Sequence, residues 1–120
     1  MKKTIIVFIL VILVGCSSNS IKSLVIDSKQ AKTMMDSEEV VVVDVRTKEE
    51  FDEGHISKAI NIPLDEIEKI DVVKDKKILV YCRSGNRSAT ASSKLVEMGY
   101  EKVYDFGGIK DWPYEVVIGE

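Results

Sequence analysis

The fold is decided by one stretch in the second half of the chain, which reads Ile78-Leu79-Val80-Tyr81 and then Cys82-Arg83-Ser84-Gly85-Asn86-Arg87-Ser88. Its first four residues are apolar or aromatic and do not alternate with polar residues. This pattern is typical of a strand that is buried on both faces of a parallel sheet. The polar segment that follows leads into a helix, which we expect over residues 88–98. The apolar residues of this helix recur at helical spacing, and a glycine ends it: Ala91, Leu95, Met98 and Gly99.

The alternation of strand and helix extends through the chain on both sides of this stretch. Residues 40–45, which are all β-branched valines except Asp44, indicate a second strand that is buried on both faces. Further strands are expected at 24–26, 59–62 and 103–104, and further helices at 28–35, 47–53 and 64–70. Ser28 is expected to cap the first of these helices, and Thr47 with Glu50 forms a capping box for the second. Strands separated by helices predict an α/β fold with a central, mostly parallel five-stranded sheet flanked by helices on both faces.

Length and composition limit what the chain can do. It has 120 residues, of which 45% are hydrophobic and 31% charged, so it holds one small domain. The net charge of -3 and the pI of about 5.3 argue against a nucleic-acid partner, because binding to phosphate backbones needs a basic surface. The only cysteines are Cys16 and Cys82, and the only histidine is His55. A zinc site with four Cys or His ligands cannot be built from them.

The first residues have the pattern of a secretory leader. Lys2 and Lys3 precede an apolar run over residues 5–14, and a polar stretch follows Cys16. A helix of ten apolar residues is about 15 Å long, roughly half the thickness of the hydrocarbon core of a bilayer. A cleaved leader is therefore favoured over a permanent transmembrane span.

The end of this leader resembles the bacterial lipobox, in which a cysteine is lipidated before cleavage. The residues that carry the resemblance are Leu13-Val14-Gly15-Cys16. The alternative is an ordinary leader with a chance cysteine. The resemblance implies a signal peptide at 1–15, a lipidated tether at 16–23 and the folded domain at 24–120. The protein would then be exported and held by lipid on the outer face of the cell membrane or on the periplasmic side.

The segment from Cys82 to Ser88 has the composition of an anion-binding loop. In open parallel sheets, functional groups gather where strands end and helices begin, and Cys82 stands there. Gly85 and Asn86 tolerate the backbone angles that turn successive N–H groups inward, and the following helix adds its positive end. Such a loop, with Arg83 and Arg87, lowers the pKa of a thiol and makes it nucleophilic. The alternative is a buried, inert structural cysteine.

The chain from residue 24 onward resembles a single-domain rhodanese, a sulfurtransferase. The loop Cys82-Arg83-Ser84-Gly85-Asn86-Arg87-Ser88 is similar to the active-site loop of that family, and Gly107-Gly108 with Trp112 is similar to its C-terminal signature. The upstream signature is carried by Asp44-Val45-Arg46, Glu49-Glu50-Phe51, Gly54-His55-Ile56, Ala59 and Asn61-Ile62-Pro63. Lys58 departs from the family, in which glycine is more common.

The resemblance implies a mechanism and a set of site residues. Cys82 would take a sulfane sulfur from a donor such as thiosulfate, hold it as a persulfide, and pass it to cyanide or a thiol. Arg83 and Arg87 would attract the anionic donor. The backbone N–H groups of the loop would hold the charge on sulfur, so the expected substrate-binding residues are Arg83, Ser84, Gly85, Asn86, Arg87 and Ser88. No metal or organic cofactor is implied, and we expect a monomer.

Three other functions compete with this one. A cysteine phosphatase needs Cys-x5-Arg, whereas Arg87 follows Cys82 by five positions, and Ser88 stands where the arginine should be. A dithiol oxidoreductase lacks its Cys-x-x-Cys pair. A binding module without activity, or a persulfide carrier that serves a partner protein, is the remaining alternative.

Three polar residues of the upstream signature are assigned structural roles. Asp44 and Arg46 are expected to form an ion pair that fixes the end of the sheet and the adjacent helix, with Glu50 as a further partner. His55 follows a helix end, and rhodanese chemistry does not require it. We therefore expect His55 to make a structural hydrogen bond.

Overall fold

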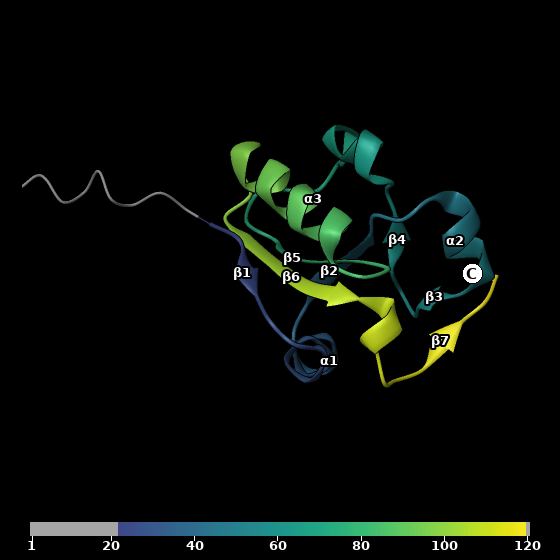
Figure 1. Ribbon diagram of the computed structural model, residues 1–120. Helices are drawn as coiled ribbons and strands as arrows, with labels where there is room; N and C mark the ends of the chain where they lie inside the picture. Colours follow the sequence, from purple (N-terminus) through teal and green to yellow (C-terminus); the bar gives the residue numbers. More distant parts are fainter. Residues whose placement is uncertain (1–21, 120) are drawn as a thin grey trace, which may run out of the picture.

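A five-stranded parallel sheet forms the centre of the molecule in the computed structural model, which describes residues 22–119 (Figure 1). The strand order is β1-β6-β5-β2-β4, and every pair of neighbours is parallel. The strands are β1 (Leu24–Val25), β2 (Val40–Asp44), β4 (Ile60–Asn61), β5 (Lys77–Cys82) and β6 (Lys102–Gly108). The predicted α/β class and five-stranded parallel sheet are therefore confirmed.

Helices cover both faces of this sheet. Figure 1 shows α3 and the 3-10 helix η2 on one face and α1 on the other. The helices are α1 (Ser28–Ser37), α2 (Lys48–Glu53), η2 (Leu64–Lys69), α3 (Asn86–Glu97) and η3 (Ile109–Asp111). Among residues 22–119, no helix is long and apolar enough to cross a membrane.

The two faces of β5 face two separate hydrophobic clusters, because successive side chains of a strand point to opposite sides. Ile78, Val80 and Cys82 lie in the cluster beneath α3, which we call the α3-side cluster. Leu79 and Tyr81 lie in the cluster beneath α1, which we call the α1-side cluster. Burial on both sides explains why the sequence of β5 is continuously apolar.

Helix starts and strand lengths differ from the sequence predictions most clearly in three places. Asp27, and not Ser28, caps α1, because its carboxylate accepts the N–H of Gln30 at 2.8 Å. Helix α3 begins at Asn86, two residues before the predicted start, since Gly85 turns the chain sharply with φ +108°. Strand β6 continues to Gly108, which pairs with Cys82. The capping box of Thr47 and Glu50 at α2 is present as predicted.

A second, two-stranded antiparallel sheet was not predicted. It joins β3 (His55–Ile56) to β7 (Val116–Val117) near the end of the chain. Each strand is two residues long, which is too short to leave a periodic pattern in the sequence. The predicted signal peptide at 1–15, Cys16 and most of the predicted tether lie outside the described residues.

Candidate active site

Cys82 ends the central strand β5, and the chain turns from it directly into α3. Its sulfur accepts the backbone N–H of Gly85 at 3.0 Å and the backbone N–H of Ser88 at 3.3 Å. The residue is 1% exposed. Gly85 adopts φ +108°, a conformation that side chains disfavour and that turns its N–H toward the sulfur. The thiol therefore lies in a backbone cradle at the positive end of a twelve-residue helix.

The balance of burial and hydrogen bonding at this cradle favours the thiolate. Burial raises the pKa of Cys82, but hydrogen bonds from Ser88, Gly85 and Ser84 outweigh it and leave the pKa lower than that of a free thiol. The hydroxyl of Ser88 has only one proton to donate. Its oxygen lies 2.8 Å from the carboxylate of Asp105, so this carboxylate competes with the sulfur for the proton. We therefore regard the backbone N–H groups as the principal donors that hold the thiolate.

The end of strand β6 packs against the loop that forms the cradle. A methyl group on Gly108 would lie 2.1 Å from the carbonyl oxygen of Arg83, so only glycine allows this close approach. The N–H of Lys110 donates to the same carbonyl oxygen at 3.3 Å. The carboxylate of Asp105 accepts the N–H of Gly107 at 2.9 Å in addition to the hydroxyl of Ser88. The glycine pair of the C-terminal signature thus has a structural role in shaping the loop.

Arg87 is held by Glu50 across the start of α3. The two terminal guanidinium nitrogens donate to the two carboxylate oxygens at 2.7 and 3.0 Å. The hydrogen bonds from Arg87, together with those from Thr47, outweigh burial and lower the pKa of Glu50 to about 2. Glu50 was expected as a further partner of Arg46; instead it pairs with Arg87, because α2 faces the first turn of α3.

The other expected substrate-binding residues lie around the mouth of the cradle. Arg83, Ser84 and Asn86 are exposed, whereas Ser88 is fully buried. Arg83 has no ion-pair partner among residues 22–119. Of the two arginines predicted to attract an anion, Arg83 therefore keeps its full charge, and Glu50 offsets the charge of Arg87.

Asp44 and Arg46 form the expected ion pair at the end of β2. Both are buried, and the guanidinium of Arg46 donates to the Asp44 carboxylate at 2.6 Å and to the carbonyl oxygen of Gly54 at 2.7 Å. The side chain of Asn61 donates to the carbonyl oxygens of Asp44 and Arg46, each at 3.0 Å. This network ties the end of β2 to Gly54, directly before β3, and to Asn61 of β4.

His55 lies apart from the cradle. Its Nδ1 is 2.9 Å from the carbonyl oxygen of Phe51, so this nitrogen carries the proton that is donated. The imidazole ring stacks on Phe51 with 3.7 Å between the ring centroids. No hydrogen bond within residues 22–119 links His55 to Cys82, and the histidine therefore has the surroundings of a structural residue.

One residue and one contact of the site were missed in the sequence. Asp105 joins Ser88 to Gly107, and the only signal for it was an acidic residue inside the otherwise apolar and aromatic stretch 103–106. The pairing of Glu50 with Arg87 left no signal, because the two residues are 37 positions apart.

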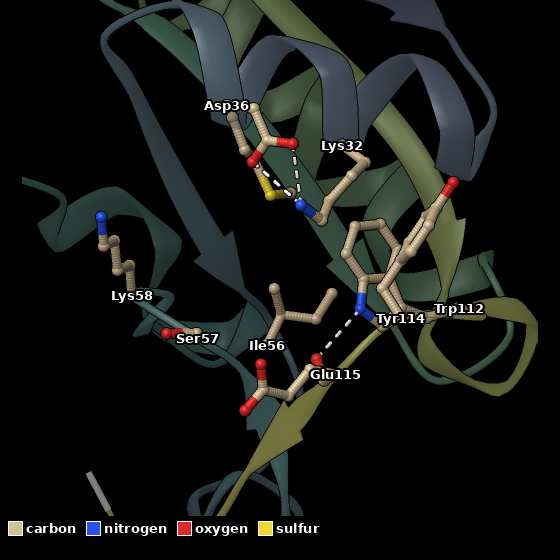
Figure 2. Close-up of a pocket in the computed structure, with 9 residues that line it drawn as sticks. Lys32, Asp36, Ile56, Ser57, Lys58, Trp112, Tyr114 and Glu115 are labelled. Carbon is tan, nitrogen blue, oxygen red and sulfur yellow. Dashed lines mark hydrogen bonds and ion pairs between the residues drawn. The ribbon is translucent and has the colours of Figure 1, made fainter.

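A cavity of about 190 Å³ lies on the other side of the sheet, between α1 and the C-terminal segment (Figure 2). Lys32 and Asp36 of α1 form an ion pair at its edge, and Trp112 lies opposite them. Ile56 and Trp112 belong to the α1-side cluster, whereas Cys82 belongs to the α3-side cluster. This cavity is therefore separate from the thiol.

A cysteine whose sulfur accepts backbone N–H groups at the N-terminus of a helix has the surroundings that favour a thiolate. The chain matches the family described as Rhodanese-like domain over residues 27–114. It therefore belongs to the rhodanese-like domain family, which confirms the resemblance seen in the motifs.

Three relatives match this chain over most of their own length. The chain is 37% identical over 91 residues to a sulfurtransferase of Allochromatium vinosum, covering 72% of this chain and 85% of that protein. It is 42% identical over 73 residues to thiosulfate sulfurtransferase PspE of Escherichia coli, covering 58% of this chain and 70% of that protein. The crystal structure of a rhodanese-related protein from Thermoplasma volcanium matches with a TM-score of 0.70 at 36% identity, over 82% of this chain and 99% of that one.

The charge of Glu50 should stabilise the fold in a pH-dependent way. Because the folded-state pKa of Glu50 is about 2, below the usual value, its contribution is present above the usual carboxyl pKa and fades as the pH falls toward 2. Glu50→Gln keeps the capping box but removes the charge, and we expect it to lower the free energy of unfolding by about 0.5–1 kcal/mol at neutral pH. Urea unfolding from neutral pH down to about pH 2.5 measures this.

The matched control is Glu49→Gln, since this neighbouring side chain is exposed and makes no ion pair within residues 22–119. It should change stability little at any pH. An equal loss in both variants would contradict the assignment of the effect to Arg87.

Proposed function

We propose that this protein transfers sulfane sulfur through a persulfide on Cys82, with thiosulfate-like anions as donors. Membership of the rhodanese-like family and similarity to thiosulfate sulfurtransferases make the chain a transferase of sulfur groups. The observation that carries the residue assignment is the cradle, in which Gly85 and Ser88 donate backbone N–H groups to the sulfur of Cys82. This geometry supports a thiolate at neutral pH and a charged persulfide after transfer.

In the first step, the Cys82 thiolate attacks the outer sulfur of thiosulfate. A bond forms between the two sulfurs, the sulfur–sulfur bond of thiosulfate breaks, and sulfite leaves with the electron pair. The balance is Cys82–S⁻ + S–SO₃²⁻ → Cys82–S–S⁻ + SO₃²⁻. The total charge is the same on both sides, and the step needs no external oxidant. Arg83 at the mouth of the cradle attracts the donor.

In the second step, a nucleophilic acceptor removes the outer sulfur. With cyanide the balance is Cys82–S–S⁻ + CN⁻ → Cys82–S⁻ + SCN⁻. The negative charge stays close to the cradle in both states, so fixed N–H groups hold it without rearranging. This is two-step covalent catalysis, for which ping-pong kinetics are expected.

Single-turnover sulfite release from thiosulfate tests the proposal, with no acceptor present. One sulfite per folded chain is expected, and the chain should gain the mass of one sulfur atom at the peptide that contains Cys82. Release of phosphate from an aryl phosphate, with no sulfite from thiosulfate, would favour the phosphatase alternative instead.

We further propose that the protein is exported and anchored by lipid at Cys16. The proposal rests on the apolar run at 5–14 and the lipobox-like residues that end it. With the anchor at Cys16, six residue steps connect it to Lys22, where the described structure begins, and these reach at most about 22 Å when extended.

Metabolic labelling with a fatty acid checks the anchor. The wild-type chain should incorporate label, and Cys16→Ala should incorporate none and remain in the uncleaved form. Cys82→Ala is the matched control and should be labelled like the wild type. Label that persists in Cys16→Ala would contradict the anchor.

A further inference from the structure

Strand β1 lies at one edge of the sheet and carries two exposed apolar side chains. It pairs with β6 on one side only, so its other edge is open. Leu24 and Val25 are 57% and 82% exposed. Among residues 22–119, they are the only two consecutive large apolar residues that are both exposed. A surface of this kind gains free energy when something apolar covers it.

Two lysines flank this pair of apolar side chains. Leu24 is opposite Tyr104 in the parallel register of β1 and β6, so Lys102 stands at the level of Lys22. Both lysines are exposed, and neither forms an ion pair within residues 22–119. The carbon stem of a lysine can cover apolar surface while its charge stays in water or among headgroups. We call the four residues Lys22, Leu24, Val25 and Lys102 the β1 corner.

The charges around the β1 corner offset one another. Glu97 and Lys22 line the same groove of about 350 Å³ between the start of β1 and α3. Glu101 directly precedes Lys102. A surface with balanced charges gains little from a strongly charged partner, whereas its apolar side chains gain by leaving water. The β1 corner therefore fits an apolar partner rather than a highly charged one.

The proposed lipid anchor is close to the β1 corner. Six residue steps connect Cys16 to Lys22 and reach at most about 22 Å when extended. A short tether turns the meeting of two surfaces into an intramolecular event, so that a weak contact becomes well populated. A bilayer that holds Cys16 is thus always within reach of Leu24 and Val25.

A second copy of the chain is the other partner that an open strand edge could bind. A stable protein interface buries about 1,200 Å² or more in total. Strand β1 has only two residues, and its two exposed side chains offer far less area than this. A bilayer needs no complementary shape, and tethering compensates for a small contact area. The size of the surface therefore favours lipid.

We propose that the β1 corner rests on the lipid bilayer, with Leu24 and Val25 at the boundary between headgroups and acyl chains. This inference rests on the proposed anchor at Cys16 and adds the surface by which the folded domain is oriented. The contact is apolar, so it should form on uncharged lipids and should not need anionic ones.

This orientation places the cradle away from the membrane. Lys77 at the start of β5 is opposite Lys102, and five residue steps of about 3.3 Å place Cys82 about 17 Å further along the strand. Figure 1 shows β1 on one side of the molecule and α2, β3 and β7 on the opposite side. The thiol therefore faces the aqueous phase, where soluble sulfur donors and acceptors can reach it.

Quenching of a fluorescent dye by nitroxide-labelled lipids tests the contact in the lipidated chain. All variants carry Cys82→Ser, and Cys16 is blocked by its lipid, so the dye reacts with one introduced cysteine. The dye is placed in the β1 corner with Lys102→Cys, or after β7 with Ile118→Cys, at a position that is 74% exposed. The chains are reconstituted in phosphatidylcholine vesicles that carry nitroxides on the acyl chains near the headgroups.

The two dye positions should differ strongly in these vesicles. We expect emission to fall by about half at residue 102, because an interfacial contact lies about 5–10 Å deep and within reach of the nitroxides. At residue 118 we expect a fall of about a tenth or less, since this position lies beyond the same depth.

A double substitution separates the contact from the effect of the tether alone. Leu24→Ser combined with Val25→Ser removes the apolar side chains but not the tether, and should reduce the quenching at residue 102 to about a tenth. Ile60→Ser combined with Ile118→Ser is the matched control, because it removes two exposed apolar side chains outside the β1 corner. It should leave the quenching at residue 102 unchanged. All four positions are exposed, so the fold should be retained.

The outcomes distinguish the contact from the anchor. If the lipidated chain floats with the vesicles but emission at residue 102 does not fall, or falls equally after Leu24→Ser with Val25→Ser, the contact is overturned and the anchor stands. If the mass of the chain shows no lipid at Cys16 and the chain does not float, the anchor is overturned and the contact with it. A loss of emission that grows with protein density in vesicles without nitroxides would indicate contact between copies and would also overturn the bilayer contact.

Discussion

Cys82→Ser should lower the rate of sulfite release from thiosulfate by at least about a thousandfold while the chain stays folded. A serine hydroxyl is almost wholly un-ionised at neutral pH and cannot hold a sulfane sulfur as a persulfide. The cradle lowers the pKa of a thiol, and the same N–H groups cannot bring a hydroxyl into the physiological range. The hydroxyl can still accept the N–H groups of Gly85 and Ser88, so the loop should keep its shape.

Single-turnover sulfite release, together with the urea unfolding midpoint, checks this expectation. Cys82→Ala is the companion variant: it removes the acceptor of both N–H groups and should be as inactive as the serine variant but less stable. Arg83→Gln provides a contrast, since it should weaken the attraction of the donor and leave one sulfite per chain at saturation. Sulfite release by Cys82→Ser at the wild-type rate would remove Cys82 from the mechanism.

The parts of the fold that could be predicted are those whose characteristic residues lie close together in the sequence. Residues 40–45 and 78–81 read as buried strands because both of their faces are covered, and they form β2 and most of β5. The capping box at α2 could be predicted because both of its partners lie within one turn of helix. The pairing of β3 with β7 could not, since it joins two-residue strands from distant parts of the chain.

The same distinction applies to the candidate site. The sequence placed Cys82 and its loop together, because the cradle is one continuous segment between a strand and a helix. It could not show that Glu50 holds Arg87, or that Asp105 holds Ser88, because these pairs are 37 and 17 positions apart. Both contacts depend on the way α2, α3 and β6 pack. The sequence therefore located the loop that surrounds Cys82 but overestimated the free positive charge beside it.

Gly108→Ala should have the second largest effect, although the hydrogen bonds to the sulfur come from Gly85 and Ser88 and not from residue 108. Its new methyl group would lie 2.1 Å from the carbonyl oxygen of Arg83 and 2.7 Å from the Cα of Ser84. Both neighbours are backbone atoms, so the loop or the end of β6 must move. We expect a loss of about 2–4 kcal/mol in the free energy of unfolding. We also expect a fall of about a hundredfold in kcat/KM for thiosulfate, because displacement of the loop misplaces the N–H groups on Cys82.

Gly107→Ala is the matched control for this prediction. A methyl group at position 107 would meet no heavy atom within 4 Å apart from its own residue and its two chain neighbours, but the backbone there has φ +88°. It should therefore cost only the strain of that conformation, about 1–2 kcal/mol. The pH dependence of iodoacetamide alkylation separates the two variants. The midpoint for Cys82 should rise toward that of a free thiol in Gly108→Ala, since fewer N–H groups hold the thiolate, and should change little in Gly107→Ala. A normal midpoint and wild-type activity in Gly108→Ala would show that the cradle does not depend on the close approach of β6.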